Sequence, residues 1–236
     1  MKKSVMWIAI VALLMAAATG AFARGSISGK AILQGAAPGE KPIKMDADPY
    51  CATAHATPVT TKHYIVGAGG GLANVFVYVK EGLAGKTFPA PKEPKLLDQH
   101  DCLYAPYVMG IQVGQPLTIQ NDDGTLHNVH CMAKNNPEFN LGQPVKGMKS
   151  EKVFTKPEVM VQFKCDVHPW MFAYIGVVDH PFYAVTKEDG SFTITGLPPG
   201  EYTLEAWHHK GGTQTQKIKV AAGEAKAQDF VFKPKS

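Results

Sequence analysis

Three side chains that could bind a metal follow one another at equal spacing in one short stretch of the chain. Cys165, His168 and Met171 offer a thiolate, an imidazole and a thioether. Soft sulfur ligands select copper, and two His, one Cys and a weakly bound Met form the ligand set of a copper site that transfers electrons. The stretch holds a single His, so this chemistry predicts that a second imidazole comes from elsewhere in the chain.

Two upstream histidines, His127 and His130, are the candidates for that second imidazole. They lie in a stretch with strand-like alternation, and successive side chains of a strand point to opposite faces. His127 then shares the core-facing side with its apolar neighbours, whereas His130 points the other way. By the same alternation, Cys165 ends the inward face of its own strand. We therefore predict that His127 is the ligand and that His130 is a solvated side chain.

Other interpretations of this metal-binding stretch fit less well. Structural zinc sites use four strong nitrogen or sulfur ligands, and a thioether is not one of them. Haem attachment requires Cys-x-x-Cys-His, and an iron–sulfur cluster requires several clustered cysteines. The sequence contains neither pattern. A lone Cys is usually a small apolar core residue, so it is the combination of ligands that indicates a metal site.

The length of the chain, its composition and its short alternating runs predict an all-β protein. Its 236 residues suffice for one large or two small β domains, and they include 23 Gly and 17 Pro. Short alternating runs dominate, no helix is predicted, and residues 44–71, 82–94 and 134–149 are expected to be irregular. Strands are predicted at 25–34, 72–80, two within 104–120, 127–132, 152–154, 159–165, 174–178, 183–186, 191–195, 201–207, 215–220 and 227–232.

Residues 1–23 have the features of a secretory signal peptide. Lys2 and Lys3 precede an apolar run over 7–18, and Ala21-Phe22-Ala23 is a small-x-small cleavage site. The run is shorter than the ~20 residues that a membrane-spanning helix needs. We therefore expect a periplasmic or secreted protein with no stable membrane insertion after cleavage. The remaining 22 basic and 20 acidic residues are not the charge balance of a nucleic-acid-binding protein.

The central part of the chain, residues 104–178, resembles a cupredoxin, a blue copper protein of the amicyanin and plastocyanin kind. The short spacing between Cys and Met is that of amicyanin. The matching motifs, in order, are Tyr104-Ala105-Pro106, Val113-Gly114-Gln115, Asn121-Asp122, His127-Asn128-Val129-His130 and Cys165-x-x-His168-Pro169-x-Met171.

This resemblance implies a Greek-key β-sandwich with one mononuclear type 1 copper site. His127, Cys165 and His168 would be its equatorial ligands, and Met171 its axial ligand. Asn128 would tie the two ligand-bearing loops together beside the Cys sulfur. The residue after the Cys is Asp166, whose charge would affect the reduction potential, because hydrogen bonds and burial around the ligands tune it.

A second resemblance covers residues 183–232, which are similar to a carboxypeptidase-regulatory-like, or transthyretin-like, β-sandwich. Asp189-Gly190-Ser191-Phe192 and the run from Gly196 to Leu204 carry it. The first two strands that such a domain implies resemble runs near the N-terminus. We therefore predict a discontinuous sandwich built from residues 24–92 with 180–236, and a cupredoxin domain at 93–179 inserted into it. Two consecutive domains with an N-terminal extension are the alternative.

The four cysteines do not all pair if Cys165 binds metal. Cys51 and Cys102 lie outside the predicted cupredoxin strands, and an oxidising compartment favours their pairing. We predict this disulfide, and we predict that Cys131 stays a buried thiol on the core-facing side of its strand. The pair His208-His209 is interpreted as exposed rather than as a metal site.

Taken together, these patterns predict an exported copper protein that carries single electrons and is not an enzyme. Enzymatic copper sites need additional His-rich motifs, which the sequence lacks. A copper-sequestering or copper-delivery protein and an adhesion or carbohydrate-binding module remain as alternatives. A redox protein is expected to dock near His168 and Trp170. The neighbours of His168 are apolar or aromatic, namely Pro169, Trp170, Phe172 and Tyr174, and exposed patches of this kind mark contact surfaces.

Overall fold

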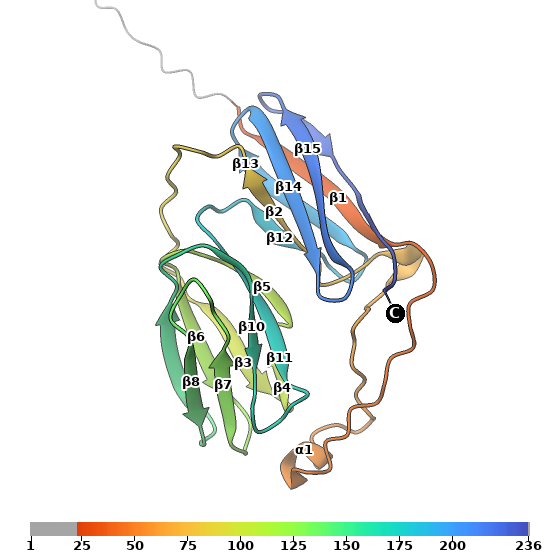
Figure 1. Ribbon diagram of the computed structural model, residues 1–236, viewed down its shortest axis with the longest axis vertical. Helices are drawn as coiled ribbons and strands as arrows, with labels where there is room; N and C mark the ends of the chain where they lie inside the picture. Colours follow the sequence, from red (N-terminus) through yellow and green to blue (C-terminus); the bar gives the residue numbers. More distant parts are fainter. Residues whose placement is uncertain (1–22, 236) are drawn as a thin grey trace, which may run out of the picture.

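The computed structural model describes residues 23–235, and nearly all of their regular secondary structure is β-strand, as the alternating runs predicted. Two β-sandwiches lie side by side in Figure 1. Most of the predicted signal peptide, residues 1–22, lies outside the described residues. The strands are β1 Gly25–Leu33, β2 Phe76–Glu81, β3 Lys95–His100, β4 Leu103–Ala105, β5 Val108–Gln112, β6 Pro116–Asn121, β7 His127–Cys131, β8 Phe139–Gln143, β9 Lys149–Val153, β10 Glu158–Lys164, β11 Phe172–Val178, β12 Tyr183–Val185, β13 Ser191–Leu197, β14 Gly200–His208, β15 Gly212–Val220, β16 Ala225–Ala227 and β17 Phe230–Phe232.

One sandwich, which we call the terminal sandwich, combines the two ends of the chain. Its first sheet has the order β13-β1-β16, with β17 also paired to β1, and its second sheet has the order β12-β2-β14-β15. β1 and β2 come from the N-terminal part, and the others come from the part after residue 180. Apolar side chains such as Ile27, Val77 and Leu204 fill the space between the sheets. The predicted domain boundaries, 24–92 with 180–236 around 93–179, stay a prediction. The pairing of β1 and β2 with strands after residue 180 is nevertheless what a discontinuous sandwich requires.

A fragment of residues 180–236 is therefore expected not to fold alone. It would lack β1, the antiparallel partner of β13, and β2, the partner of β14. Both remaining strands would then expose unpaired edges and an apolar face, which favours aggregation. Circular dichroism and a proton–nitrogen NMR spectrum of the fragment, with the full chain as control, test this. A well-dispersed spectrum from the fragment would instead support consecutive domains.

The other sandwich, which we call the central sandwich, is formed by β3–β11. Its sheets have the orders β5-β11-β10-β7-β8 and β4-β3-β6-β9. Alternating residues of each strand point between the sheets, as in β6, where Leu117 and Ile119 are fully buried. β7 pairs with β10, so the strands that carry His127 and Cys165 at or beside their ends are neighbours in one sheet.

The two sandwiches pack against each other through β2. As predicted, its residues alternate: Val77 and Val79 enter the terminal core, whereas Phe76 and Tyr78 point to the opposite face. That opposite face meets β5 and β11 of the central sandwich. Gly176 allows this close approach, because a Cβ there would lie 2.4 Å from the ring of Phe76. Both faces of β2 are therefore buried, as in a strand between two cores.

Three segments differ from the sequence-based expectation. Residues 134–149, predicted as a loop, contain β8, and residues 95–100, for which no strand was predicted, form β3. The irregular stretch 44–71 contains a short helix, α1 (Pro49–Thr53), and a 3-10 turn at Ala68–Gly70. A helix of five residues has too few positions to show a 3.6-residue period, and β8 alternates among mostly polar residues, so neither gives a hydrophobic pattern.

The stretch that contains α1 leaves the terminal sandwich and reaches the far end of the central one. We call residues 41–61 the cap. Its two arms pair through Ile43 and Val59, and α1 lies at its tip (Figure 1). Met45 and Cys51 of the cap are buried in the core cluster of the central sandwich. The cap therefore packs as part of that core, although it lies between two strands of the other sandwich.

Candidate metal centre

Three of the four predicted ligands meet at the end of the central sandwich that the cap covers. His127 begins β7, and Cys165 and His168 lie in the turn between β10 and β11. The Nδ1 atoms of His127 and His168 are 2.9 Å apart, and the Sγ atom of Cys165 lies 3.7 Å from Nδ1 of His168. All three side chains are buried. Strand pairing and one tight turn therefore bring two imidazoles and one thiol to a common point.

Each of the two imidazoles is oriented by a carboxylate. Nε2 of His127 donates to Oδ2 of Asp123 at 2.8 Å, and Nε2 of His168 donates to Oδ2 of Asp48 at 3.1 Å. An ionised carboxylate can only accept hydrogen bonds, so in a neutral imidazole each pair holds the proton on Nε2 and leaves Nδ1 as the nitrogen that could bind a metal. Such carboxylate–imidazole pairs are the usual outer partners of metal-binding His residues.

This donor set fits a copper ion. Metal bonds of about 2.0 Å to nitrogen and about 2.3 Å to sulfur require donor atoms that lie a few ångströms apart. The donor atoms of His127, Cys165 and His168 all lie within 4.8 Å of one another. A thiolate with two imidazoles matches the equatorial set of a blue copper site.

Met171 lies on the other side of the same turn and is fully buried in the core cluster that contains Cys165. Its backbone N–H donates to the carbonyl of His168, and its carbonyl accepts from the N–H of Cys165. These two bonds close the turn around the ligands. They hold Met171 in the buried core beside Cys165, so its thioether is available as a fourth candidate ligand.

Asn128 joins the two ligand-bearing segments, as the resemblance implied. Its Oδ1 accepts from the backbone N–H groups of Asp166 and Val167 and from the Cys165 thiol. The exposed carboxylate of Asp166 accepts from Lys164 at 2.8 Å and from His130 at 2.9 Å. The negative charge of Asp166, the residue after Cys165, is therefore largely compensated by the side chains of Lys164 and His130.

The electrostatics of the site prepare the thiol for a metal. Burial would raise the pKa of Cys165, but hydrogen bonds from His127 and from backbone N–H groups lower it below its ordinary value. Burial would likewise lower the pKa of His127, but its bonds to Asp123 and Cys165 raise it to about 9. Both shifts run against the effect of burial, and thiolate is the form of cysteine that binds metals.

Sequence reasoning missed both orienting carboxylates. Asp123 lies four residues before His127, in the turn after β6, so an acidic residue at that spacing was a local signal. Asp48 lies 120 positions before His168. It caps α1, because its other oxygen accepts from the N–H groups of Tyr50 and Cys51, and an Asp followed by Pro is a typical helix start. That signal could predict the helix but not its contact with the metal centre.

The cap covers the edge of His168 that we expected to face a partner. His168 is 2 % exposed, and its Nε2 lies 3.7 Å from Sγ of Cys51. Of the residues expected to form an exposed apolar patch, only Pro169 is exposed, whereas Trp170 and Phe172 are half-buried and Tyr174 is buried. The Trp170 indole donates to the carbonyl of Cys102 at 3.0 Å. The expectation of an exposed patch is therefore wrong for most of its members.

The predicted disulfide between Cys51 and Cys102 is confirmed. Cys131 and Cys165 are the free cysteines of the described residues, and both are buried. Burial raises the pKa of Cys131 to about 12, so it is a neutral core thiol, as strand alternation predicted. The disulfide fixes α1 to the chain between β3 and β4, beside the metal centre.

The remaining histidines singled out from the sequence have structural contacts. His130 points outward and bonds to Glu138 and Asp166, as predicted. His208 is buried rather than exposed, and its Nδ1 accepts from the N–H of Gly211, which closes the turn between β14 and β15. His209 packs among aromatic rings, including that of Tyr174. In residues 23–235, no group of three potential metal ligands includes His208 or His209.

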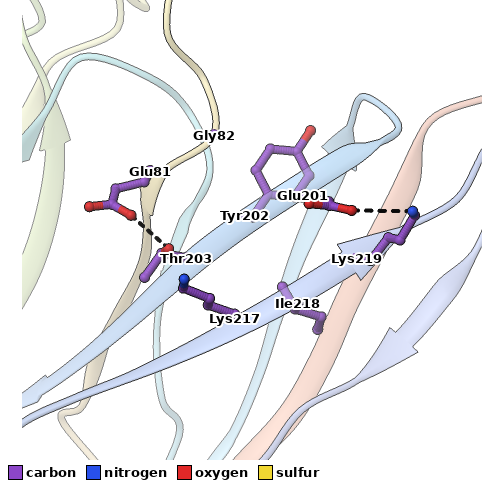
Figure 2. Close-up of a pocket in the computed structure, with 8 residues that line it drawn as sticks. All are labelled: Glu81, Gly82, Glu201, Tyr202, Thr203, Lys217, Ile218 and Lys219. Carbon is purple, nitrogen blue, oxygen red and sulfur yellow. Dashed lines mark hydrogen bonds and ion pairs between the residues drawn. The ribbon is translucent and has the colours of Figure 1, made fainter.

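The terminal sandwich has a hollow of its own, which Figure 2 shows along β2, β14 and β15. Two of its charged side chains form an ion pair, Lys219 with Glu201 at 3.2 Å, and the hydroxyl of Thr203 donates to Glu81 at 2.8 Å. Exposed ion pairs of this kind contribute little to stability. Within the described residues, none of these side chains belongs to a group of potential metal ligands.

Comparison with known protein families gives a match in the C-terminal part of the chain. Residues 171–233 match the family model of the carboxypeptidase regulatory-like domain. A search of the curated proteins found no match.

Solved structures similar to this chain include copper proteins. An amicyanin variant in the Cu(I) state is 21 % identical over 43 % of this chain and 97 % of its own, with a TM-score of 0.32. A purple cupredoxin from Nitrosopumilus maritimus is 29 % identical over 32 % of this chain and 81 % of its own, with a TM-score of 0.28. The copper-containing nitrite reductase from Thermus scotoductus is 20 % identical over 41 % of this chain, which spans only 25 % of that enzyme, with a TM-score of 0.34. We base the metal centre on the side-chain geometry above.

Within the described residues, no helix is long and apolar enough to cross a membrane.

Proposed function

We propose that this chain is an exported type 1 copper protein that carries single electrons between redox partners. The observation that carries this proposal is the convergence of two imidazole Nδ1 atoms and the Cys165 sulfur in a buried site. His127, Cys165 and His168 would hold the metal, with Met171 as the axial ligand. Bound copper would supply a one-electron change of oxidation state.

The protein would keep these ligands in one geometry throughout that change. Asp123 and Asp48 hold the two imidazoles from outside, and Asn128 holds the turn that carries Cys165. All the ligand side chains are excluded from water. A site whose ligands are fixed by surrounding hydrogen bonds need not rearrange when the charge of the metal changes, which suits a carrier of electrons.

Export is part of the proposal. The disulfide between Cys51 and Cys102 supports it, because disulfides persist in oxidising compartments.

The proposal also assigns no catalytic reaction to the chain. The other ligand groupings in the described residues that contain sulfur use Cys51 or Cys102, and both of these are disulfide-bonded.

The partner is proposed to be a redox protein that docks at the covered end of the central sandwich. Pro169 is exposed there, and the half-buried ring of Trp170 lies 5.0 Å from that of His168, measured between centroids. Electron-transfer encounters bury small areas, typically below about 1,200 Å². A partner that contacts Pro169 and the outer surface of the cap would therefore suffice.

Copper storage or delivery is the second candidate, and the cap favours storage. The cap buries the one ligand edge that would otherwise face solvent. A closed site of this kind would slow the exchange of copper with external ligands. Storage and electron transfer share the ligand set and differ in what happens to the metal.

Voltammetry of the copper-loaded full chain separates the two candidates. We expect a reversible one-electron wave and full retention of copper after many cycles, because the ligands stay fixed in both oxidation states. Metal content is measured before and after cycling, in the presence of a Cu(I) chelator. Ready transfer of reduced copper to the chelator would instead identify a delivery protein, and a colourless protein without bound copper would contradict both.

A further inference from the structure

The imidazole of His168 has no free edge at which a redox partner could touch it. Its Nδ1 atom faces the Nδ1 atom of His127 at 2.9 Å, inside the metal centre. Its Nε2 atom faces the cap, 3.1 Å from Oδ2 of Asp48 and 3.7 Å from Sγ of Cys51. Since His168 is only 2 % exposed, another group must connect it with the surface of the protein.

Trp170 supplies that connection. Within residues 23–235, its indole is the one aromatic ring, apart from the ligands themselves, that packs against a ligand imidazole. The ring centroids of Trp170 and His168 are 5.0 Å apart, with an angle of 44° between the ring planes. Centroid separations of about 4.5–7 Å are typical of aromatic rings in contact. The indole and the imidazole therefore touch directly.

The indole is also held in this position. Its Nε1 donates to the carbonyl of Cys102 at 3.0 Å, and Cys102 is disulfide-bonded to Cys51 in the cap. The same covalent link therefore fixes both the cap over His168 and the acceptor that orients Trp170. A functional side chain that its neighbours hold in place keeps its geometry, so the spacing between the indole and the imidazole stays constant.

The other side of Trp170 lines a cavity that opens to the surface. Its volume is about 440 Å³, and it lies between the cap, the loop before β5 and the start of β11. Pro169 and Lys62 line it and are exposed, whereas Trp170 and Phe172 line it and are half-buried. Unlike His168, Trp170 can therefore be reached from outside the molecule.

We propose that Trp170 is the residue through which electrons pass between His168 and the surface, at the wall of this cavity. This role rests on the proposed function, because it needs a redox-active metal at the candidate site. In the exchange, the reduced site loses one electron and an outer-sphere acceptor in the cavity gains it. The indole acts as a bridge and is not itself oxidised, and its N–H stays bonded to Cys102. A saturated side chain would couple the two more weakly, since it has no π-system in contact with the imidazole.

Stopped-flow oxidation of the reduced, copper-loaded full chain by tris(phenanthroline)cobalt(III) tests this role. This acceptor takes up one electron without forming a bond to the protein, and its flat aromatic ligands suit an apolar wall. Trp170→Leu keeps an apolar side chain but removes the indole. It should lower the second-order rate constant about tenfold, equivalent to about 1.4 kcal/mol in activation free energy. Trp170→Phe keeps a ring and should give an intermediate rate. The visible spectrum and the reduction potential should stay unchanged in both variants, because Trp170 is not a ligand.

Phe172→Leu is the matched control. Phe172 lines the same cavity and is half-buried, but its ring packs against Tyr107 rather than against His168. Its replacement should leave the rate constant unchanged. Equal rates for Trp170→Leu and the unmodified chain, or equal losses in both Leu variants, would overturn the proposal. A slower Trp170→Leu protein with an altered spectrum or potential would also overturn it, since Trp170 would then have a structural role.

Fluorescence of the metal-free chain gives a second readout that involves no external acceptor. Cu(II) added to the candidate site should quench the emission of Trp170, whereas redox-inactive Zn(II) should leave most of it. This difference should largely disappear in Trp170→Phe, and equal quenching in that variant would count against the proposal. An unmodified chain that binds no copper and stays colourless would contradict the proposed function itself. A coloured protein whose rates do not depend on Trp170 would contradict only the role of Trp170.

Discussion

Replacing Cys165 by Ser is expected to abolish the intense visible absorption of the copper-loaded protein. That absorption requires charge transfer from a thiolate sulfur to copper, and a hydroxyl cannot supply it. Copper affinity should fall by more than about 100-fold, beyond the 10–100-fold that loss of an outer hydrogen-bond partner typically costs. Absorption spectra and competition titrations with a copper chelator measure the two effects. The fold should persist, because Ser is close in size to the buried Cys.

His130→Ala is the control for this experiment. His130 lies near the ligands in sequence but points outward, where it bonds to Glu138 and Asp166. Its removal should leave the absorption band and the copper affinity unchanged. A Cys165→Ser protein that stays intensely coloured would show that the sulfur is not a ligand. Loss of colour in His130→Ala would show that the ligand assignment within β7 is wrong.

Removing the disulfide should have the largest effect on stability. Cys51 and Cys102 are 51 positions apart, and closing a loop of that length contributes about 4 kcal/mol on the chain-entropy model. We expect the double variant Cys51→Ala with Cys102→Ala to lose a similar free energy of unfolding, measured by urea denaturation. The cap should also loosen, because apolar contacts and the hydrogen bonds of Asp48, Tyr50 and His55 would then have to hold it over His168 without a covalent link.

Hydrogen exchange of the α1 amides reports on the cap directly and should become faster in the double variant. Treatment of the unmodified protein with a dithiol should reproduce both changes, whereas the double variant should not respond to it. A loss of stability below about 1 kcal/mol, with unchanged exchange in α1, would show that the cap is held by packing alone.

Much of the fold and the convergence of most candidate ligands could be predicted, because those features depend on near neighbours in the sequence. Alternation of side chains in β2 separated Val77 from Phe76, and the same rule placed His127 inward and His130 outward. Cys165, His168 and Met171 lie in one turn, so their spacing alone indicated a shared site. The pairing of Cys51 with Cys102 followed once the other two cysteines had been assigned to strand faces.

The sequence by itself therefore determined the all-β class and the set of candidate ligands, because strand periodicity and short turns are local properties. The tertiary structure alone decided what covers and orients those ligands. Asp48 bonds to His168 across 120 positions, and α1 reaches the site only because the chain leaves the terminal sandwich after β1. Contacts between residues so distant leave no periodic signal, since they depend on how two sandwiches and the segment between them pack together.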